Sequence, residues 1–171
     1  NLLSITRMGG AQTRLATKPG AAEEVLGEAV HKFSRRYPAI HISVCVPDEL
    51  LMVPMDAILI EQVLSNLLEN AAVHGRTTTE IHLTLQADGK YARFTVSDNG
   101  VGISPRELPM LFDGTLKHSE TPQGDGKRNM GLGLSVCRAI IRAHGGTISA
   151  RNLSHGAEFT FRLPLSKEDP A

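Results

Sequence analysis

Apolar residues recur along the chain with two different periods. In three segments they return every three or four residues, as at Val25, Leu26 and Ala29, which is typical of a helix with one buried face. In five shorter segments apolar and polar residues alternate, as in strands with one buried face. The three predicted helices cover residues 21–37, 55–74 and 132–144. The five predicted strands cover residues 41–46, 81–85, 92–96, 147–151 and 157–163.

These elements predict a fold. Strands that are apolar on one side leave the other side of their sheet in water, so all three helices are expected on a single face. The predicted fold class is an α/β two-layer sandwich, with a mixed sheet of about five strands packed on three helices. The 171 residues and the 41% apolar fraction suit one such domain, placed at residues 21–165. Residues 1–20 are expected to hold the end of a helix and a linker, and residues 166–171 a C-terminal tail.

Charge and composition exclude several partners. Eighteen Lys and Arg balance eighteen Asp and Glu, whereas a protein that grips many phosphates of DNA carries a basic excess. No segment approaches the roughly 20 apolar residues that cross a bilayer. We therefore expect no nucleic-acid partner and no direct membrane contact. Cys45 and Cys137 lie far apart in apolar surroundings, which suits a reducing cytoplasmic compartment.

Two asparagines lie on one face of the second predicted helix. Asn66 and Asn70 are four residues apart, with His74 one turn further on. Apolar neighbours place both amides near the core, where an unpaired amide costs roughly 1–3 kcal/mol. Each amide therefore either bonds neighbouring backbone or offers its carbonyl oxygen to a hard cation. Mg²⁺ is such a cation, and it takes few protein oxygens when phosphates supply the other ligands.

Asp98 follows the third predicted strand on the same side as Phe94 and Val96, and so points toward the core. A buried carboxylate has to be paired or hydrogen-bonded. Gly100 and Gly102 allow the next residues to turn tightly and to approach a ligand closely. The segment is either an ordinary turn after a strand or a site where Asp98 accepts a hydrogen bond from an exocyclic amine such as N6 of adenine.

A polar segment and a glycine-rich turn precede the last predicted helix. Residues 113–130 hold almost no apolar side chain, which predicts a mobile lid. The turn that follows, at the expected start of the helix, consists of Gly131, Leu132, Gly133 and Leu134. A helix N-terminus presents free backbone N–H groups and a positive dipole end to an anion. Glycines also permit close packing, so this turn alone does not define a phosphate site.

In combination these segments resemble the N, G1, F and G2 boxes of the sensor histidine kinases, in that family's order and spacing. The matching residues are 66–71 (NLLENA), 98–103 (DNGVGI), 111–112 (LF) and 131–134 (GLGL). The resemblance extends over residues 21–165, and its details are most similar to the KdpD type of potassium- and turgor-sensing kinase. Residues 1–8 (NLLSITRM) resemble the end of the second helix of the dimerisation and phosphoacceptor domain.

The resemblance implies the Bergerat or GHKL fold, which binds ATP and Mg²⁺ beneath a flexible lid. It implies that Asn70 ligates Mg²⁺, that Asn66 assists near the phosphates and that His74 lies beside the nucleotide. It further implies that the backbone N–H groups of residues 131–134 hold the phosphates.

The same resemblance implies how the base is bound. Asp98 would accept a hydrogen bond from adenine N6, and Gly102 would join it through a water molecule. Gly100 belongs to the same loop, and Ile103 would lie against the purine ring. Phe112 would anchor the near end of the lid.

Three positions depart from the family pattern. Val73 stands where the family usually has Lys, Asn129 where it usually has Gly, and Ala157 where it usually has Thr or Gly. The absent lysine removes a charge-assisted contact to the triphosphate. Either a cation of the predicted lid, namely Lys117, Lys127 or Arg128, takes the place of this lysine, or the domain binds ATP weakly.

The residue at position 66 indicates whether the phosphoryl group is transferred to an acceptor or to water. The related ATPases carry Glu there as the base for water, whereas this chain has Asn66, so transfer to an acceptor is favoured over direct hydrolysis. Family acceptor histidines are followed by Glu or Asp, and none of the seven histidines here is. We therefore expect γ-phosphoryl transfer from ATP to a histidine on an upstream dimerisation and phosphoacceptor domain of an inner-membrane sensor, which would then serve a response regulator.

Two other functions stay open on this reading. One is a degenerate domain that binds a nucleotide or a partner and regulates without phosphotransfer, which the changes at Val73 and Asn129 allow. The other is a GHKL ATPase or an anti-sigma serine kinase, which Asn66 and the helical start of the chain disfavour.

Overall fold

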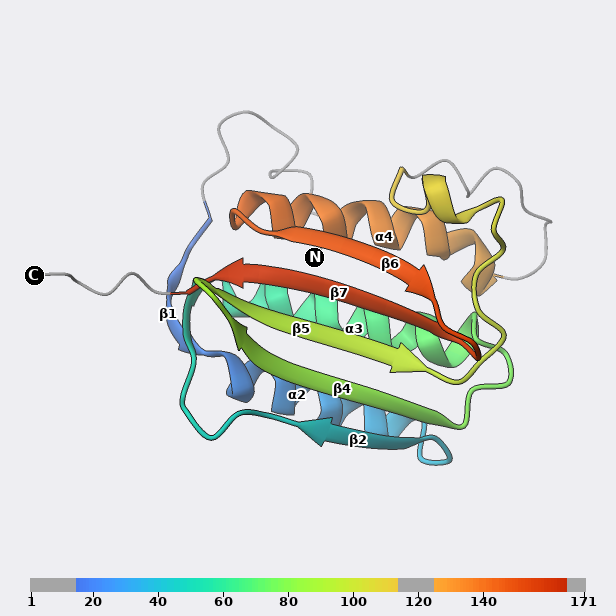
Figure 1. Ribbon diagram of the computed structural model, residues 1–171, viewed down its shortest axis with the longest axis horizontal. Coiled ribbons are helices and arrows are strands. Elements are labelled where there is room, and N and C mark those ends of the chain that lie inside the picture. Colours follow the sequence, from blue (N-terminus) through green and yellow to red (C-terminus); the bar gives the residue numbers. More distant parts are fainter. Residues whose placement is uncertain (1–14, 114–124, 166–171) are drawn as a thin grey trace, which may run out of the picture.

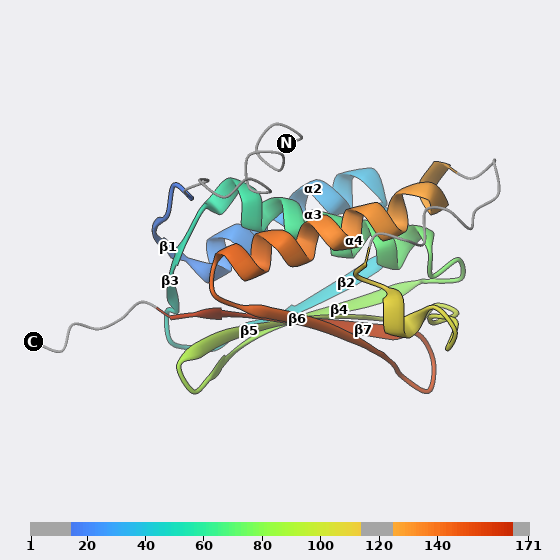
Figure 2. The same cartoon turned by 90° about the horizontal axis from the view of Figure 1, so that it is seen from above.

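Three helices cover one face of a five-stranded sheet, and no helix of the described residues lies on its other face (Figures 1 and 2). The computed structural model describes residues 15–113 and 125–165, with the backbone alone for residues 125–132. The predicted α/β two-layer sandwich is confirmed. The helices are α2 (Ala22–Arg36), α3 (Ala57–Val73) and α4 (Asp125–Ala143).

The sheet is mixed, as predicted. Its order is β2-β4-β5-β7-β6, in which β2 runs parallel to β4 and every other neighbouring pair is antiparallel. The strands are β2 (His41–Cys45), β4 (Glu80–Asp88), β5 (Tyr91–Asp98), β6 (Thr147–Asn152) and β7 (Ala157–Pro164). Strands β4 and β5 form a hairpin, and Gly89 takes a φ of 67° in its turn, a conformation that glycine adopts without strain.

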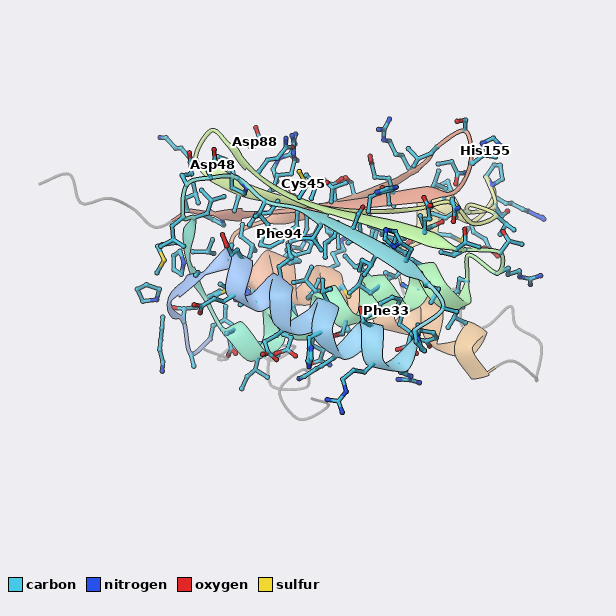
Figure 3. The ribbon with its side chains drawn as sticks, turned by 90° about the horizontal axis from the view of Figure 1, so that it is seen from below. Phe33, Cys45, Asp48, Asp88, Phe94 and His155 are labelled. Carbon is cyan, nitrogen blue, oxygen red and sulfur yellow. The ribbon has the colours of Figure 1, made fainter. Side chains whose placement is uncertain are left out.

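The core lies between the sheet and the helices. Alternate residues of β5 and β7 point into it, and the rings of Phe94 and Phe161 stack there at 4.5 Å between centroids. Figure 3 shows Phe94 between the sheet and the helix layer. Leu64, Leu67 and Leu68 are fully buried from the central helix α3. The alternating strands and the helical period in the sequence therefore meet in one apolar layer.

A second, two-stranded sheet was not predicted. It consists of β1 (Lys18–Ala21) and β3 (Met52–Met55), paired antiparallel with Pro19 opposite Pro54. Proline lacks a backbone donor and is tolerated in such marginal ladders. The predicted helix start at residue 55 was wrong, because Met55 belongs to β3 and Asp56 provides the N-cap of α3, where its carboxylate accepts a hydrogen bond from the Leu59 N–H at 3.4 Å.

The start of the last helix was also predicted wrongly. Helix α4 begins at Asp125, several residues before the expected start at residue 132. The glycine-rich residues 131–134 therefore lie inside the helix, and the second part of the expected lid is helical. Weak helix propensity of the two glycines concealed this extension.

Some predictions fall outside the described residues. They are the helix end at residues 1–8, the central part of the lid at residues 114–124 and the tail at residues 166–171. The connection that follows β5 contains the short 3₁₀ helix η1 (Leu108–Met110). No helix in the described ranges is long and apolar enough to span a bilayer.

His144 connects the end of α4 to the start of α3. Its Nδ1 lies 2.8 Å from the carbonyl oxygen of Ile140, and its Nε2 accepts a hydrogen bond from the Asp56 backbone N–H at 3.0 Å. This arrangement requires a neutral ring with its proton on Nδ1. Burial is the main cause that lowers the pKa of His144 below its ordinary value.

We expect this histidine to make the fold sensitive to acid. Because the folded pKa is depressed, its contribution to the free energy of unfolding is complete above about pH 6.5 and is lost as the pH falls through the folded pKa. His144→Ala should lower the free energy of unfolding at pH 7 by about 1–3 kcal/mol, since it leaves the Asp56 N–H without its acceptor. Denaturant titrations between pH 5 and 7.5 should then show a flatter pH dependence than in the wild type. The exposed His82 provides the control, and an equal flattening in His82→Ala would contradict the assignment.

Candidate functional site

Asp98 is a buried carboxylate without a cation beside it. It ends β5, and the residue is 7% exposed, as its strand position predicted. Its Oδ1 accepts backbone hydrogen bonds from Gly100 at 2.8 Å and from Ala157 at 3.4 Å. Burial raises the pKa of Asp98, and these two donors act in the opposite direction. Within the described residues no Lys, Arg or His forms an ion pair with Asp98.

Both of these hydrogen bonds end on the same oxygen. Oδ2 of Asp98 therefore has no hydrogen-bond partner among the described residues. A carboxylate oxygen that is shielded from bulk water and lacks a protein donor is a candidate acceptor for a ligand. An exocyclic amine supplies the kind of donor that this oxygen requires.

Glycines fix the backbone around Asp98. A Cβ on Gly100 would lie 2.5 Å from the carbonyl oxygen of Gly75, which follows α3. Gly156 has a φ of 99°, and a Cβ there would collide with the backbone of Asp98. Gly102 has a φ of 84° in the same loop. These close approaches hold the end of β5, the end of α3 and the start of β7 together, and Gly156 was not singled out from the sequence.

The two amides of α3 differ in their surroundings. Asn66 is half-buried, and its Nδ2 donates to the sulfur of Cys137 on α4 at 3.6 Å. Burial raises the pKa of the Cys137 thiol to about 12, so the group stays neutral. Asn70 is also half-buried, and no described residue bonds its side-chain amide. His74 is the C-cap of α3, and its backbone N–H donates to the Asn70 carbonyl at 2.8 Å.

The carboxylates of α3 point away from these amides, toward α2. Oε2 of Glu61 lies 2.6 Å from Nζ of Lys32, and Oε2 of Glu69 accepts from the Tyr37 hydroxyl at 3.1 Å. Neither side chain therefore takes the position of a base beside Asn70. This observation agrees with the expectation that direct hydrolysis has no dedicated base on this helix.

The glycine-rich segment lies on α4, shortly before Cys137, which contacts Asn66 of α3. Leu134 is fully buried in the core. Gly133 is half-buried, yet a Cβ there would have no atom within 4 Å, so no described contact requires glycine at this position. Backbone N–H groups inside a helix are committed to intrahelical bonds, so the predicted phosphate contact at residues 131–134 requires a helix start that differs from the one observed at Asp125. That contact stays a prediction.

The near end of the expected lid is attached to the domain in two ways. The ring of Phe112 meets that of Phe159 edge to face at 6.3 Å between centroids. Asp113 and Arg138 of α4 form an ion pair at 3.6 Å. Leu111 is fully buried beside them. The segment that enters residues 114–124 is thus fixed to β7 and α4.

The open face of the sheet holds a separate hollow of about 460 Å³. Three arginines line it, and each is already engaged. Arg93 and Arg162 share the carboxylate of Asp88, and Arg151 bonds Glu158 at 2.7 Å. A triphosphate needs cations that are not neutralised in this way, so this hollow is a weaker candidate than the loop around Asp98.

The two-layer sandwich, with a buried carboxylate at the end of β5, defines the class of domain, and the comparisons with known proteins agree with that fold. A family model described as histidine kinase-, DNA gyrase B- and HSP90-like ATPase matches residues 55–167, so the chain belongs to this family. The predicted resemblance to the sensor histidine kinases is confirmed, and the domain is of the ATP-binding kind that they carry.

Two of the relatives that this chain is similar to are sensor proteins named KdpD. The chain is 39% identical to the sensor protein KdpD of Clostridium acetobutylicum over 165 residues, which is 96% of this chain and 18% of that protein. It is 33% identical to KdpD of Escherichia coli K12 over 170 residues, which is 98% of this chain and again 18% of the relative. The chain thus spans less than a fifth of these two relatives.

Solved structures show the same fold. The catalytic domain of histidine kinase ThkA matches with a TM-score of 0.73 and 29% identity, over 88% of this chain and 96% of that one. Full-length ShkA in complex with AMPPNP matches with a TM-score of 0.76 and 29% identity, over 98% of this chain and 35% of that one.

Proposed function

We propose that this domain binds ATP with Mg²⁺ and donates the γ-phosphoryl group to a histidine on another domain of its parent protein. The observation that carries the proposal is Asp98, which is buried, lacks a cation partner in the described part of the chain and keeps one oxygen without a donor. Adenine N6 supplies the matching donor. The ShkA match, whose structure contains AMPPNP, supports the same nucleotide class.

The metal would be held on α3. An amide oxygen suits Mg²⁺, and it does not repel the phosphates that provide the other ligands. Asn70 fits because its amide has no partner among the described residues, whereas Asn66 is already engaged by Cys137. Asn70 is therefore the proposed Mg²⁺ ligand, and Asn66 and His74 line the phosphate side of the site. Bound Mg²⁺ would neutralise charge that develops on the phosphates.

The rest of the site would orient the nucleotide. Gly100 and Gly102 let the backbone approach the base, and Ile103 would lie against its ring. Phe112 would hold the near end of the lid, and residues 131–134 would contact the phosphates. Catalysis then rests on positioning and charge neutralisation and needs no covalent intermediate on this chain.

The residues of α3 favour transfer of the phosphoryl group to an acceptor over direct hydrolysis of ATP. Asn66 stands where a base for water would lie, and Glu61 and Glu69 bond residues of α2. The acceptor proposed is a histidine of a dimerisation and phosphoacceptor domain, which would pass the group to a response regulator. For the parent we propose an inner-membrane sensor whose kinase domain faces the cytoplasm.

Val73 is the main reason to test affinity first. It is 38% exposed at the end of α3 and supplies no charge where the family usually has Lys. Calorimetry of the chain with AMPPNP, with and without Mg²⁺, should show binding that Mg²⁺ strengthens. Absence of binding under both conditions would favour a regulatory domain without phosphotransfer.

The reaction itself requires the parent protein. After incubation with γ-labelled ATP, we expect acid-labile label on a histidine of the parent. Steady release of inorganic phosphate without labelled protein would instead favour the ATPase, and label on a serine of a separate protein would favour a serine kinase.

A further inference from the structure

The side chain of Asn152, a residue outside the loop that follows Asp98, holds that loop by hydrogen bonds. The residue ends β6 and forms two hydrogen bonds with Ile103, which is 49 positions away in the sequence. Its Nδ2 donates to the Ile103 carbonyl oxygen at 2.7 Å, and its Oδ1 accepts from the Ile103 N–H at 2.7 Å. One side-chain amide thus satisfies both backbone groups of a residue that belongs to no strand.

The same amide also contacts the neighbouring glycine. A Cβ on Gly102 would lie 2.9 Å from Oδ1 of Asn152. Gly102 has its φ of 84° at this point, so the backbone turns directly beside the amide. The side chain therefore fits closely against both Gly102 and Ile103, and a larger or shorter group would not reproduce the two hydrogen bonds.

Among the described residues, other hydrogen bonds attach only the first part of this loop, where the Asn99 side chain bonds Thr79 and Glu80. Gly100 donates to the Asp98 carboxylate at 2.8 Å, and the Val101 N–H donates to the Gly75 carbonyl at 2.9 Å. Both contacts lie before Gly102. Ile103 is 8% exposed and lies at the edge of the core. Both hydrogen bonds of its backbone are formed with Asn152, so its position depends on that residue.

We propose that Asn152 is a positioning residue of the purine pocket, which acts through the backbone of Gly102 and the side chain of Ile103. This inference rests on the proposed function, because it concerns the same base. The amide sets the distance between the ring-facing Ile103 and the carboxylate of Asp98, and so determines how closely an adenine fits between them. No contact between Asn152 and the nucleotide is needed.

Two substitutions at this position separate the two hydrogen bonds. Asn152→Ala removes both, whereas Asn152→Asp keeps the acceptor for the Ile103 N–H and loses the donor to its carbonyl. Calorimetry with AMPPNP and Mg²⁺ should show a dissociation constant raised about tenfold in Asn152→Ala and by at least as much in Asn152→Asp, whose second carboxylate oxygen would face the Ile103 carbonyl oxygen. A loss of affinity in the isosteric variant identifies the hydrogen bonds, rather than the size of the side chain, as the cause.

A second nucleotide distinguishes positioning of the base from general damage. We expect the ratio of the GMPPNP to the AMPPNP dissociation constant, measured by competition, to shrink in Asn152→Ala, because a loosened pocket discriminates less between bases. Arg151→Gln is the matched control, because Arg151 precedes Asn152 on β6 and its side chain bonds only the half-buried Glu158 among the described residues. This control should retain the wild-type ratio, and thermal unfolding without nucleotide should stay within a few degrees for all three variants.

The outcomes are separable. Wild-type protein that fails to bind AMPPNP contradicts the proposed function itself. Binding by the wild type together with unchanged affinity and base ratio in Asn152→Ala overturns the role of Asn152 alone. A loss of affinity that follows the loss of folded protein, with the base ratio unchanged, also overturns it and leaves Asn152 a structural residue.

Discussion

Asp98→Asn should weaken the binding of adenine nucleotides roughly 10- to 100-fold and shift the base preference toward guanine or hypoxanthine. A hydrogen bond to a charged group contributes about 1.5–3 kcal/mol, which corresponds to this loss. The two measurements are calorimetric titrations with AMPPNP and with GMPPNP, both in the presence of Mg²⁺.

The change in preference follows from the geometry around the carboxylate. The N–H groups of Gly100 and Ala157 both donate to Oδ1. In the amide variant these donors require an oxygen at that position, so the NH₂ group takes the position of Oδ2. A donor then faces the base. It opposes the amine of adenine at N6 but matches the O6 acceptor of guanine or hypoxanthine.

The same substitution should not destabilise the fold. Burial raises the pKa of Asp98, which means that the folded state disfavours the ionised carboxylate. Replacing it by a neutral amide should therefore leave the unfolding temperature unchanged or raise it, while binding falls. A variant that loses stability and binding together would indicate a structural carboxylate.

Asp88→Asn provides the matched control. Its carboxylate accepts from Nε of Arg162 at 2.8 Å, and this hydrogen bond is the largest cause that lowers the pKa of Asp88. Figure 3 shows Asp88 and His155 at opposite ends of the sheet, and His155 precedes Gly156, which packs on Asp98. The control should keep wild-type nucleotide affinity. Equal affinity in both Asp variants would contradict the base-reading role of Asp98.

Local patterns were sufficient to predict most of the fold and the burial of Asp98. Alternation placed Asp98 on the side of Phe94 and Val96, and the residue is buried. Local sequence led to a wrong prediction for the start of α3, where two possible helix-start signals competed. Pro54 resembles the first residue of a helix, but the cap at Asp56 and the pairing of β1 with β3 determine the start of α3. Only the tertiary pairing distinguishes these alternatives.

The missed site features are contacts between residues far apart in the chain. Asn152 lies 49 positions from Ile103, and Gly156 packs on Asp98 across the sheet. The bond from Asn66 to Cys137 spans 71 positions. A polar residue at the end of a strand and a glycine in a turn are ordinary features of a sequence, so no local pattern distinguishes these residues. The boxes named the candidate site residues, which stay predictions, but not the distant residues that hold the backbone around Asp98 in place.

Asn70→Leu should remove the enhancement of nucleotide binding by Mg²⁺. The substitution keeps a side chain of similar size at a half-buried helix position and deletes the only ligand oxygen that the side chain offers. Even partners outside the coordination shell change metal affinity by about 10- to 100-fold, so the loss of a direct ligand should weaken AMPPNP binding in Mg²⁺ by at least about tenfold. In EDTA, where no metal contributes, wild type and variant should bind alike.

Glu69→Gln is the control for this helix, because the Glu69 side chain bonds Tyr37, which follows α2, and so points away from the site. It should keep the full enhancement by Mg²⁺. A further variant, Asn66→Leu, tests whether the metal ligand is Asn70 rather than Asn66, whose Nδ2 donates to Cys137. If Asn70→Leu kept the enhancement and Asn66→Leu lost it, the ligand would lie one turn earlier on α3. Retention by both variants would mean that the protein provides no amide ligand from this helix and that Mg²⁺ is held by the phosphates and water alone.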